Sequence, residues 1–253
     1  MVSKIKEVAS KYWLTAACLI ALFAFYYYET ETGQADAFLF PTVDEIGKSL
    51  SENWQLMFSN MFASFGLIVP SIILSLAIAL SLGTLLGMNK KLRDGLHPII
   101  YTFSVIPAIL LSPFALILAP TITVAAIFLI VYGTVWATLF ATITGIMAID
   151  KRYLDKAKTL ELSGWKLIVK VVLPAASPAI IGGFVNSLRS SFVMLVFAEM
   201  YGAQQGMGYF VKKYADFGIY SNTWAGVIFL ALVLVIVMQF FEHLKTYLLR
   251  WTV

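Results

Sequence analysis

The polar segment Asp150–Pro174 contains the densest group of charged side chains in this sequence. It carries six of the chain's 18 Lys and Arg residues, and long apolar runs adjoin it on both sides. Basic and apolar side chains interleaved in this way suit a helix that lies in the groove of a soluble partner, or one that lies on acidic lipid. The pattern alone leaves both open. The six cations are Lys151, Arg152, Lys156, Lys158, Lys166 and Lys170.

A second chemically notable residue is Arg189, which lies inside the apolar run Ala175–Met200. A cation within a membrane span is costly and usually faces a bundle interior or a wet cavity. Arg189 could help an anionic or carbonyl-bearing substrate to pass, or it could pair with Glu199, Asn186 or backbone carbonyls. For Glu199 we favour a structural part over a gate. Aromatic residues could line a path for a planar substrate, although core or lipid-facing positions are more common; these are Phe103, Tyr132, Trp136 and Phe192.

Residue patterns of catalysis are absent from the sequence. It contains no G-x-x-x-x-G-K-[ST] for ATP, no G-x-S-x-G and no H-E-x-x-H. A single cysteine, Cys18, and two histidines exclude a disulfide framework and make metal chemistry improbable. We therefore expect no catalytic, cofactor or metal site and no enzyme activity in this chain. We also expect no nucleic-acid binding, because the basic residues lie at the ends of apolar runs, where membrane topology explains them.

The elements that must position these residues are membrane helices. A mean hydropathy of +0.85 and only 13% charged residues are typical of an integral membrane protein. A hydrocarbon core about 30 Å thick needs roughly 20 apolar residues per helix. We predict an all-α domain of residues 1–253, with a first span and outer loop in 1–37 and a core in 38–251. The six predicted spans are Tyr12–Tyr28, Phe62–Met88, Ile99–Ala119, Thr121–Ile149, Ala175–Met200 and Thr223–Leu249.

The distribution of Lys and Arg predicts the orientation. With the N-terminus inside, Lys4, Lys6 and Lys11, the polar segment between spans four and five, and the C-terminal cations are all cytoplasmic. Only three cations then fall outside: Lys48, Lys212 and Lys213. The positive-inside rule therefore predicts that both termini are cytoplasmic.

Local signals predict how the connecting segments fold. Asp150 can cap a helix with an apolar stripe of Leu154, Ala157 and Leu160, and Gly164 can supply the left-handed residue that ends it. A second short helix is expected over Trp165–Val172.

Outside the membrane we expect a surface helix over Val43–Leu56, capped by Thr42, and a short helix near Tyr209–Tyr214. Pro107 and Pro113 should kink the third span, and a tight hairpin should follow at Ala119–Pro120.

These residues resemble a family pattern. The run DKAKTLELSGWKLIVKVVLP is similar to the E-A-A-x-x-x-G…I-x-L-P loop of binding-protein-dependent ABC transporter permeases. Asp155 stands at the Glu position, Ala157 matches the second Ala, and Leu173–Pro174 matches the closing dipeptide. Lys156 replaces the first Ala, and Glu161 stands where the Gly belongs. The segments FPTVDEI, Ala198–Gly202 and Gly206–Tyr209 resemble the nitrate, sulfonate and taurine branch.

This resemblance implies an inner-membrane permease subunit of an ATP-driven importer. In the family, the loop is a coupling helix that rests on a cytoplasmic ATP-binding subunit, a pair of which binds ATP and Mg²⁺. An external binding protein delivers the substrate, and the permease is commonly paired with a second copy of itself. The implied coupling residues are Asp155, Ala157, Lys158, Thr159, Leu160, Glu161, Ser163 and Gly164. The pore candidates are Arg189, Asn186, Glu199, Phe192 and Tyr132.

The principal alternative is an ion- or proton-coupled secondary transporter. That class would need internal repeats and intramembrane carboxylates, of which the sequence offers few. The substrate is not evident from the sequence.

Overall fold

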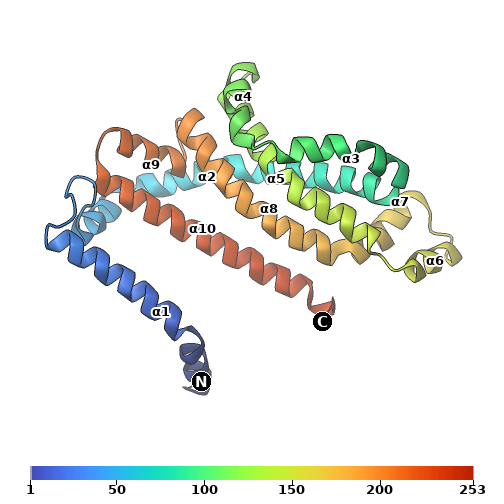
Figure 1. Cartoon of the computed structure of the whole chain (residues 1–253), viewed down its shortest axis with the longest axis horizontal. Helices are drawn as coiled ribbons and strands as arrows, with labels where there is room; N and C mark the ends of the chain where they lie inside the picture. Colours follow the sequence, from blue (N-terminus) through green and yellow to red (C-terminus); the bar gives the residue numbers. More distant parts are fainter. Residues whose placement is uncertain (1, 253) are drawn as a thin grey trace.

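The computed structural model describes the backbone of residues 2–252 and the side chains of residues 13–251, so the side chains of Lys4, Lys6 and Lys11 lie outside the described residues. All regular structure within this range is helical, which confirms the all-α class. Figure 1 shows the helices running roughly along one long axis. They are α1 (Val2–Glu31), α2 (Val43–Met88), α3 (Lys90–Val105), η1 (Ala108–Leu111), α4 (Ser112–Leu118), α5 (Ile122–Met147), α6 (Lys151–Thr159), α7 (Gly164–Leu167), η2 (Ile168–Val172), α8 (Leu173–Gly202), α9 (Met207–Asp216), α10 (Tyr220–Leu248) and η3 (Arg250–Thr252).

The core of the bundle is α5 packed between α2 and α8. Small residues let these helices approach closely, because a Cβ on Gly83 would lie 2.6 Å from the Thr142 side chain and one on Gly183 would lie 2.2 Å from Ala141. Gly83 therefore packs against α5 within the chain. Buried hydroxyls add hydrogen bonds between helices, such as the 2.6 Å contact of Thr138 with Ser187.

Helix α2 is longer than the sequence indicated. Thr42 caps it as predicted, in a reciprocal capping box with Glu45. The prediction of a separate surface helix over Val43–Leu56 is wrong, because the helix continues without a break to Met88. No glycine or proline interrupts Leu56–Phe62, and Pro70 is accommodated inside the helix. At 1.5 Å per residue, its 46 residues extend roughly 69 Å, about twice the hydrocarbon thickness.

The third predicted span is broken. Helix α3 ends at Val105, and the segment Ala108–Leu118 (η1 and α4) leaves it at an angle of 82°. Pro107 lies at the break, as expected for a residue that cannot continue the hydrogen-bond ladder. The predicted hairpin follows, with α4 ending at Leu118 and α5 starting at Ile122.

The fifth predicted span begins earlier than expected. The short helix predicted over Trp165–Val172 is not separate, since α7, η2 and α8 form one helix of 39 residues, Gly164–Gly202. The η2 segment is a π-helix, in which the Leu173 N–H donates to the Ile168 carbonyl. Pro174 follows directly and has no N–H to donate, which gives a physical reason for a widened turn here.

The number of spans in the described residues is four, or five if the bent α3–α4 pair counts as one. Helix α1 is not among them, so the sixth span stays a prediction. Trp13, Leu19 and Phe23 on α1 are 64%, 62% and 59% exposed. At its far end the Tyr26 hydroxyl donates to the Pro41 carbonyl at 2.7 Å. Figure 1 shows α1 diverging from the bundle toward the N-terminus.

The two ends of the bundle differ. Helix α9 confirms the predicted short helix near Tyr209–Tyr214 and packs on α8 and α10. Figure 1 shows α9 at one end of the long axis and the α6 segment at the other.

Candidate functional site

Helix α6 is fixed at its start by Asp150. One carboxylate oxygen accepts from the Arg152 backbone N–H at 2.9 Å, which confirms the predicted cap. The other accepts from the Arg152 guanidinium at 2.5 Å. These hydrogen bonds, the side-chain one first, lower the pKa of Asp150. The cap is therefore ionised throughout the neutral pH range.

The end of α6 is a reverse turn with a left-handed residue. The Leu162 N–H donates to the Ala157 carbonyl and the Glu161 N–H to the Lys158 carbonyl, both at 2.9 Å. This pair of bonds is a Schellman motif, whose left-handed position is normally glycine. Here Glu161 occupies it with φ +54°. The prediction that Gly164 ends the helix is wrong, although Gly164 is also left-handed, with φ +56°, where α7 begins.

The predicted apolar stripe of α6 is partly packed on the bundle and partly exposed. Ala157 is 2% exposed, and Leu154 packs on a cluster that includes Ile146 and Val172. Leu160 is instead 70% exposed, and Trp165 is 74% exposed. The remaining predicted coupling residues are all exposed: Asp155, Lys158, Thr159, Glu161, Ser163 and Gly164. A short helix therefore holds polar and apolar side chains toward the outside while its buried face fixes it to the bundle.

A second candidate site is a pocket at the break of the third span, called here the Arg189 pocket. It has a volume of about 540 Å³ and is lined by Ser104–Ile109, by α5 and by α8. Its lining residues include Arg189, Ser190, Tyr132 and Trp136. The Tyr132 hydroxyl donates to the Phe103 carbonyl at 2.5 Å across the break.

The partner of Arg189 is a residue that sequence reasoning missed. The Arg189 guanidinium lies 3.5 Å from a carboxylate oxygen of Glu242 on α10, and the acid it pairs with is therefore not Glu199. The second oxygen of Glu242 lies 3.4 Å from the Lys245 ammonium. Glu242 is the one acid within the last predicted span, and an acid at such a position could have indicated it as a partner for Arg189.

Phe192, Asn186 and Glu199 are not part of the lining of the Arg189 pocket. Phe192 is buried in the hydrophobic core beside Leu129 and Leu195, and Asn186 is exposed outside the lining of the Arg189 pocket. Among the five candidates, therefore, only Arg189 and Tyr132 share a pocket.

Glu199 has a structural contact instead. It is fully buried, and its carboxylate accepts from the Gly208 N–H at 2.8 Å. On α2, Asn60 and Ser64 accept from the N–H groups of Gly206 and Met207 at 2.8 and 2.9 Å. These three side chains hold the start of α9 against α2 and α8. Asn60 and Ser64 were not singled out in the sequence, because their partners lie more than 140 residues away.

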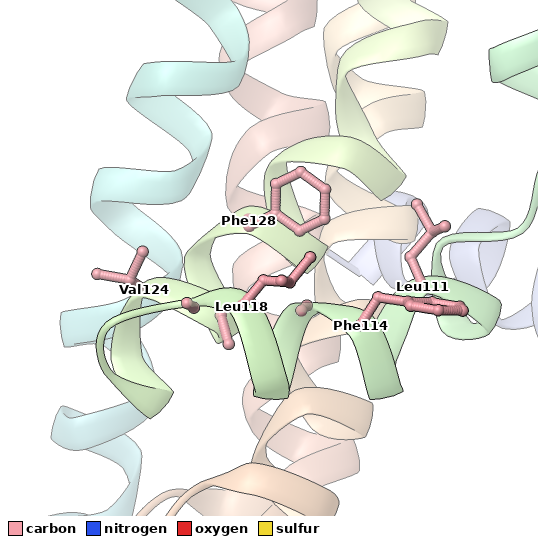
Figure 2. Close-up of a pocket in the computed structure, with 8 residues that line it drawn as sticks. Leu111, Phe114, Leu118, Val124 and Phe128 are labelled. Atoms are coloured by element: carbon pink, nitrogen blue, oxygen red, sulfur yellow. The ribbon is translucent and has the colours of Figure 1, made fainter.

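A pocket of about 340 Å³ between α4 and α5 has different chemistry. Figure 2 shows Leu111, Phe114, Leu118, Val124 and Phe128 around it. Its lining residues offer no hydrogen-bonding side chain, so it suits an apolar neighbour rather than a polar solute. No group of three or more His, Cys, Asp or Glu side chains suited to a metal ion occurs among the described residues.

Comparisons with known proteins agree on one class. Residues 75–252 match the model of a family described as "Binding-protein-dependent transport system inner membrane component". An aliphatic sulfonates transport permease protein of Bacillus subtilis, SsuC, is 30% identical over 179 residues, 71% of this chain and 65% of that protein. The bicarbonate transport system permease protein CmpB of Synechococcus elongatus is 29% identical over 87% of this chain and 78% of that protein.

Among solved structures, a bacterial ABC transporter involved in alginate import has a chain of similar fold. The TM-score is 0.66 at 16% identity, with 96% of this chain and 99% of that chain covered.

Proposed function

Because this chain belongs to the family of binding-protein-dependent transport system inner membrane components, we propose that it is the transmembrane permease subunit of an ATP-driven importer. The observation that carries the proposal is the segment from α6 to the start of α7 at one end of the bundle. Its capped helix α6 is anchored by the buried Ala157, while Leu160 after α6 and Trp165 in α7 are exposed. The mechanism is alternating access, driven from this segment. The family match argues against the alternative of a secondary transporter.

The exposed face of α6 and its turn is the coupling surface. Leu160 and Thr159 insert into a groove of the ATP-binding subunit, and Asp155, Lys158, Glu161, Ser163 and Gly164 surround them. Ala157 acts from behind this surface, because its side chain is buried and its carbonyl closes the turn. Neighbouring cations such as Lys156 and Arg152 orient the partner electrostatically.

The topology that fits this function has six spans and cytoplasmic termini. Helix α1 supplies the sixth span, and the Lys and Arg bias assigns the α6 end to the cytoplasm and the α9 end to the outside. A pair of cytoplasmic subunits binds ATP and Mg²⁺, an extracytoplasmic binding protein delivers substrate at the α9 end, and a second copy of this chain completes the pathway. This chain has no catalytic part in the cycle.

The proposed substrate is a small anion. The relatives named for aliphatic sulfonates and for bicarbonate both carry anionic solutes, and Arg189 provides a cation in a pocket of this chain. An ammonium-type cargo would be repelled at the same position.

The test is co-purification of the chain, in mild detergent from its native membrane, with an ATP-binding protein. Asp155→Arg combined with Leu160→Arg should remove that protein and abolish ATP-driven uptake. Leu92→Arg, on an exposed leucine of α3, is the matched control and should do neither. Purification of the wild-type chain alone, together with uptake that continues without ATP, would contradict the proposal.

A further inference from the structure

The Arg189 pocket has an unusual set of polar groups. Arg189 is the one charged residue in its lining, and Ser190 adds a hydroxyl group, whereas the Ser104 hydroxyl donates to the Tyr101 carbonyl at 2.8 Å. No carboxylate side chain is part of the lining. The Trp136 indole N–H is buried at the wall and finds no hydrogen-bond acceptor among the described residues. The Trp136 nitrogen is too deeply buried to reach a solute, so the cavity offers the Arg189 guanidinium and the Ser190 hydroxyl and no acid, which suits a solute that brings acceptor oxygens.

The backbone around the pocket points to a polar solute as well. Ile106 and Pro107 leave the helical ladder at the break between α3 and η1, within a segment apolar enough to span a membrane. Non-helical backbone at membrane depth is tolerated where it is buried in protein or lines a water-filled cavity. Discontinuous helices of this kind form solute sites in other transporter folds. The break and the guanidinium thus meet at one place in the bundle.

The counter-ion of Arg189 is held loosely. The distance to Glu242 is 3.5 Å, and the two side chains are 65% and 40% exposed. A single contact at 3.5 Å leaves most of the guanidinium N–H donors unused, so Arg189 can bind a second anion or exchange Glu242 for it. Lys245 lies 3.4 Å from the other oxygen of Glu242, so the carboxylate keeps a cation when the guanidinium turns away.

We propose that the Arg189 pocket is an anion-binding subsite of the transport pathway, for a sulfonate or carbonate-type group, and that Glu242 is the internal counter-ion which the bound anion replaces. The guanidinium binds two oxygens of the anion at once, and the Ser190 hydroxyl completes the contact. Tyr132 and Phe197 form the aromatic walls. The inference rests on the proposed function for its substrate class, but its test requires no transport.

The test is anion binding to the purified full-length chain in lipid nanodiscs. The probes are ethanesulfonate and bicarbonate at constant ionic strength, with ethyl methyl sulfone as the uncharged analogue, and the readout is the shift of the melting temperature with probe concentration. We expect saturable stabilisation by at least one anion and none by the sulfone. Arg189→Gln should weaken anion binding roughly tenfold or more, because a charge-assisted bidentate contact is lost. Lys48→Gln, at an exposed ion pair on α2, is the matched control and should leave affinity unchanged.

Glu242→Gln separates an anion site from a structural ion pair. If Arg189 binds the anion, removing its internal competitor should strengthen binding several-fold, opposite in sign to Arg189→Gln. If the pair only holds α8 to α10, both variants should weaken binding or fold poorly together, and the double variant should recover; either result would overturn the inference. Absence of anion binding by the wild-type chain would overturn it too, while the co-purification test of the proposed function would still stand or fall by itself.

Discussion

The turn after α6 predicts a gain of local stability from Glu161→Gly. Glu161 has φ +54°, and a left-handed conformation costs a residue with a Cβ about 1–2 kcal/mol. Glycine removes that cost but adds roughly 0.4–1 kcal/mol of backbone entropy to the unfolded segment. The difference is a net gain of about 0 to 1.6 kcal/mol with a midpoint of about 0.8 kcal/mol, which is a factor of about four in the equilibrium for opening the turn.

The measurement is hydrogen exchange at the Leu162 amide, whose bond to the Ala157 carbonyl closes the turn. Glu161→Ala is the matched variant, since it also removes the carboxylate but keeps the Cβ. Hydrogen-exchange protection should therefore be higher in Glu161→Gly than in Glu161→Ala, by about fourfold at the midpoint of that range. Equal protection in the two variants would refute the claim that the left-handed backbone is strained.

Three further predictions concern the bundle. Gly183→Ala should lower the melting temperature clearly, because the new Cβ would lie 2.2 Å from the Cβ of Ala141. Gly182→Ala is the control and should be neutral or slightly stabilising, because a Cβ there has nothing within 4 Å. Similar effects of the two substitutions would contradict the close packing of α5 on α8. A double-mutant cycle of Thr138→Val and Ser187→Ala should give a coupling energy of about 0.6–1.7 kcal/mol in chemical unfolding. A coupling energy near zero would show that their hydrogen bond does not stabilise the bundle. Glu199→Ala should leave the Gly208 N–H without its buried acceptor and lower the free energy of unfolding by about 1–3 kcal/mol. Limited proteolysis should then cut this variant near the start of α9. Glu199→Gln should stay resistant, because the amide oxygen still accepts the hydrogen bond.

Features set by neighbouring residues were predictable from the sequence. The Asp150 cap, the Thr42 capping box and the break at Pro107 each depend on a few consecutive residues, and the structure confirms all three. The all-α class followed from composition and hydropathy alone.

Features set by tertiary geometry were not predictable. The continuity of α2 depends on what the segment after Leu56 packs against, and the π-turn at η2 depends on how Pro174 is accommodated. The pairing of Arg189 with Glu242 depends on where α8 and α10 lie side by side. The strained turn shows the same limit: Glu161 was recognised at a position usually held by glycine, yet its left-handed backbone followed only from the observed hydrogen bonds.

The unbroken helix Gly164–Gly202 has a mechanical consequence. Its 39 residues span roughly 58 Å, with the α6 turn at one end, Arg189 along its length and the anchor of α9 at the other. Because the helix is continuous, a displacement at one end tilts the whole helix, and a tilt of roughly 5° about one end moves the other end by roughly 5 Å. The π-helical segment Ile168–Val172 contains one residue more than an α-helical turn would, so the helix can shift by one residue at this place. Under the proposed function, this helix would transmit a displacement of the α6 turn to Arg189 and to the anchor of α9, and the π-helical segment beside α6 would be the adjustable part.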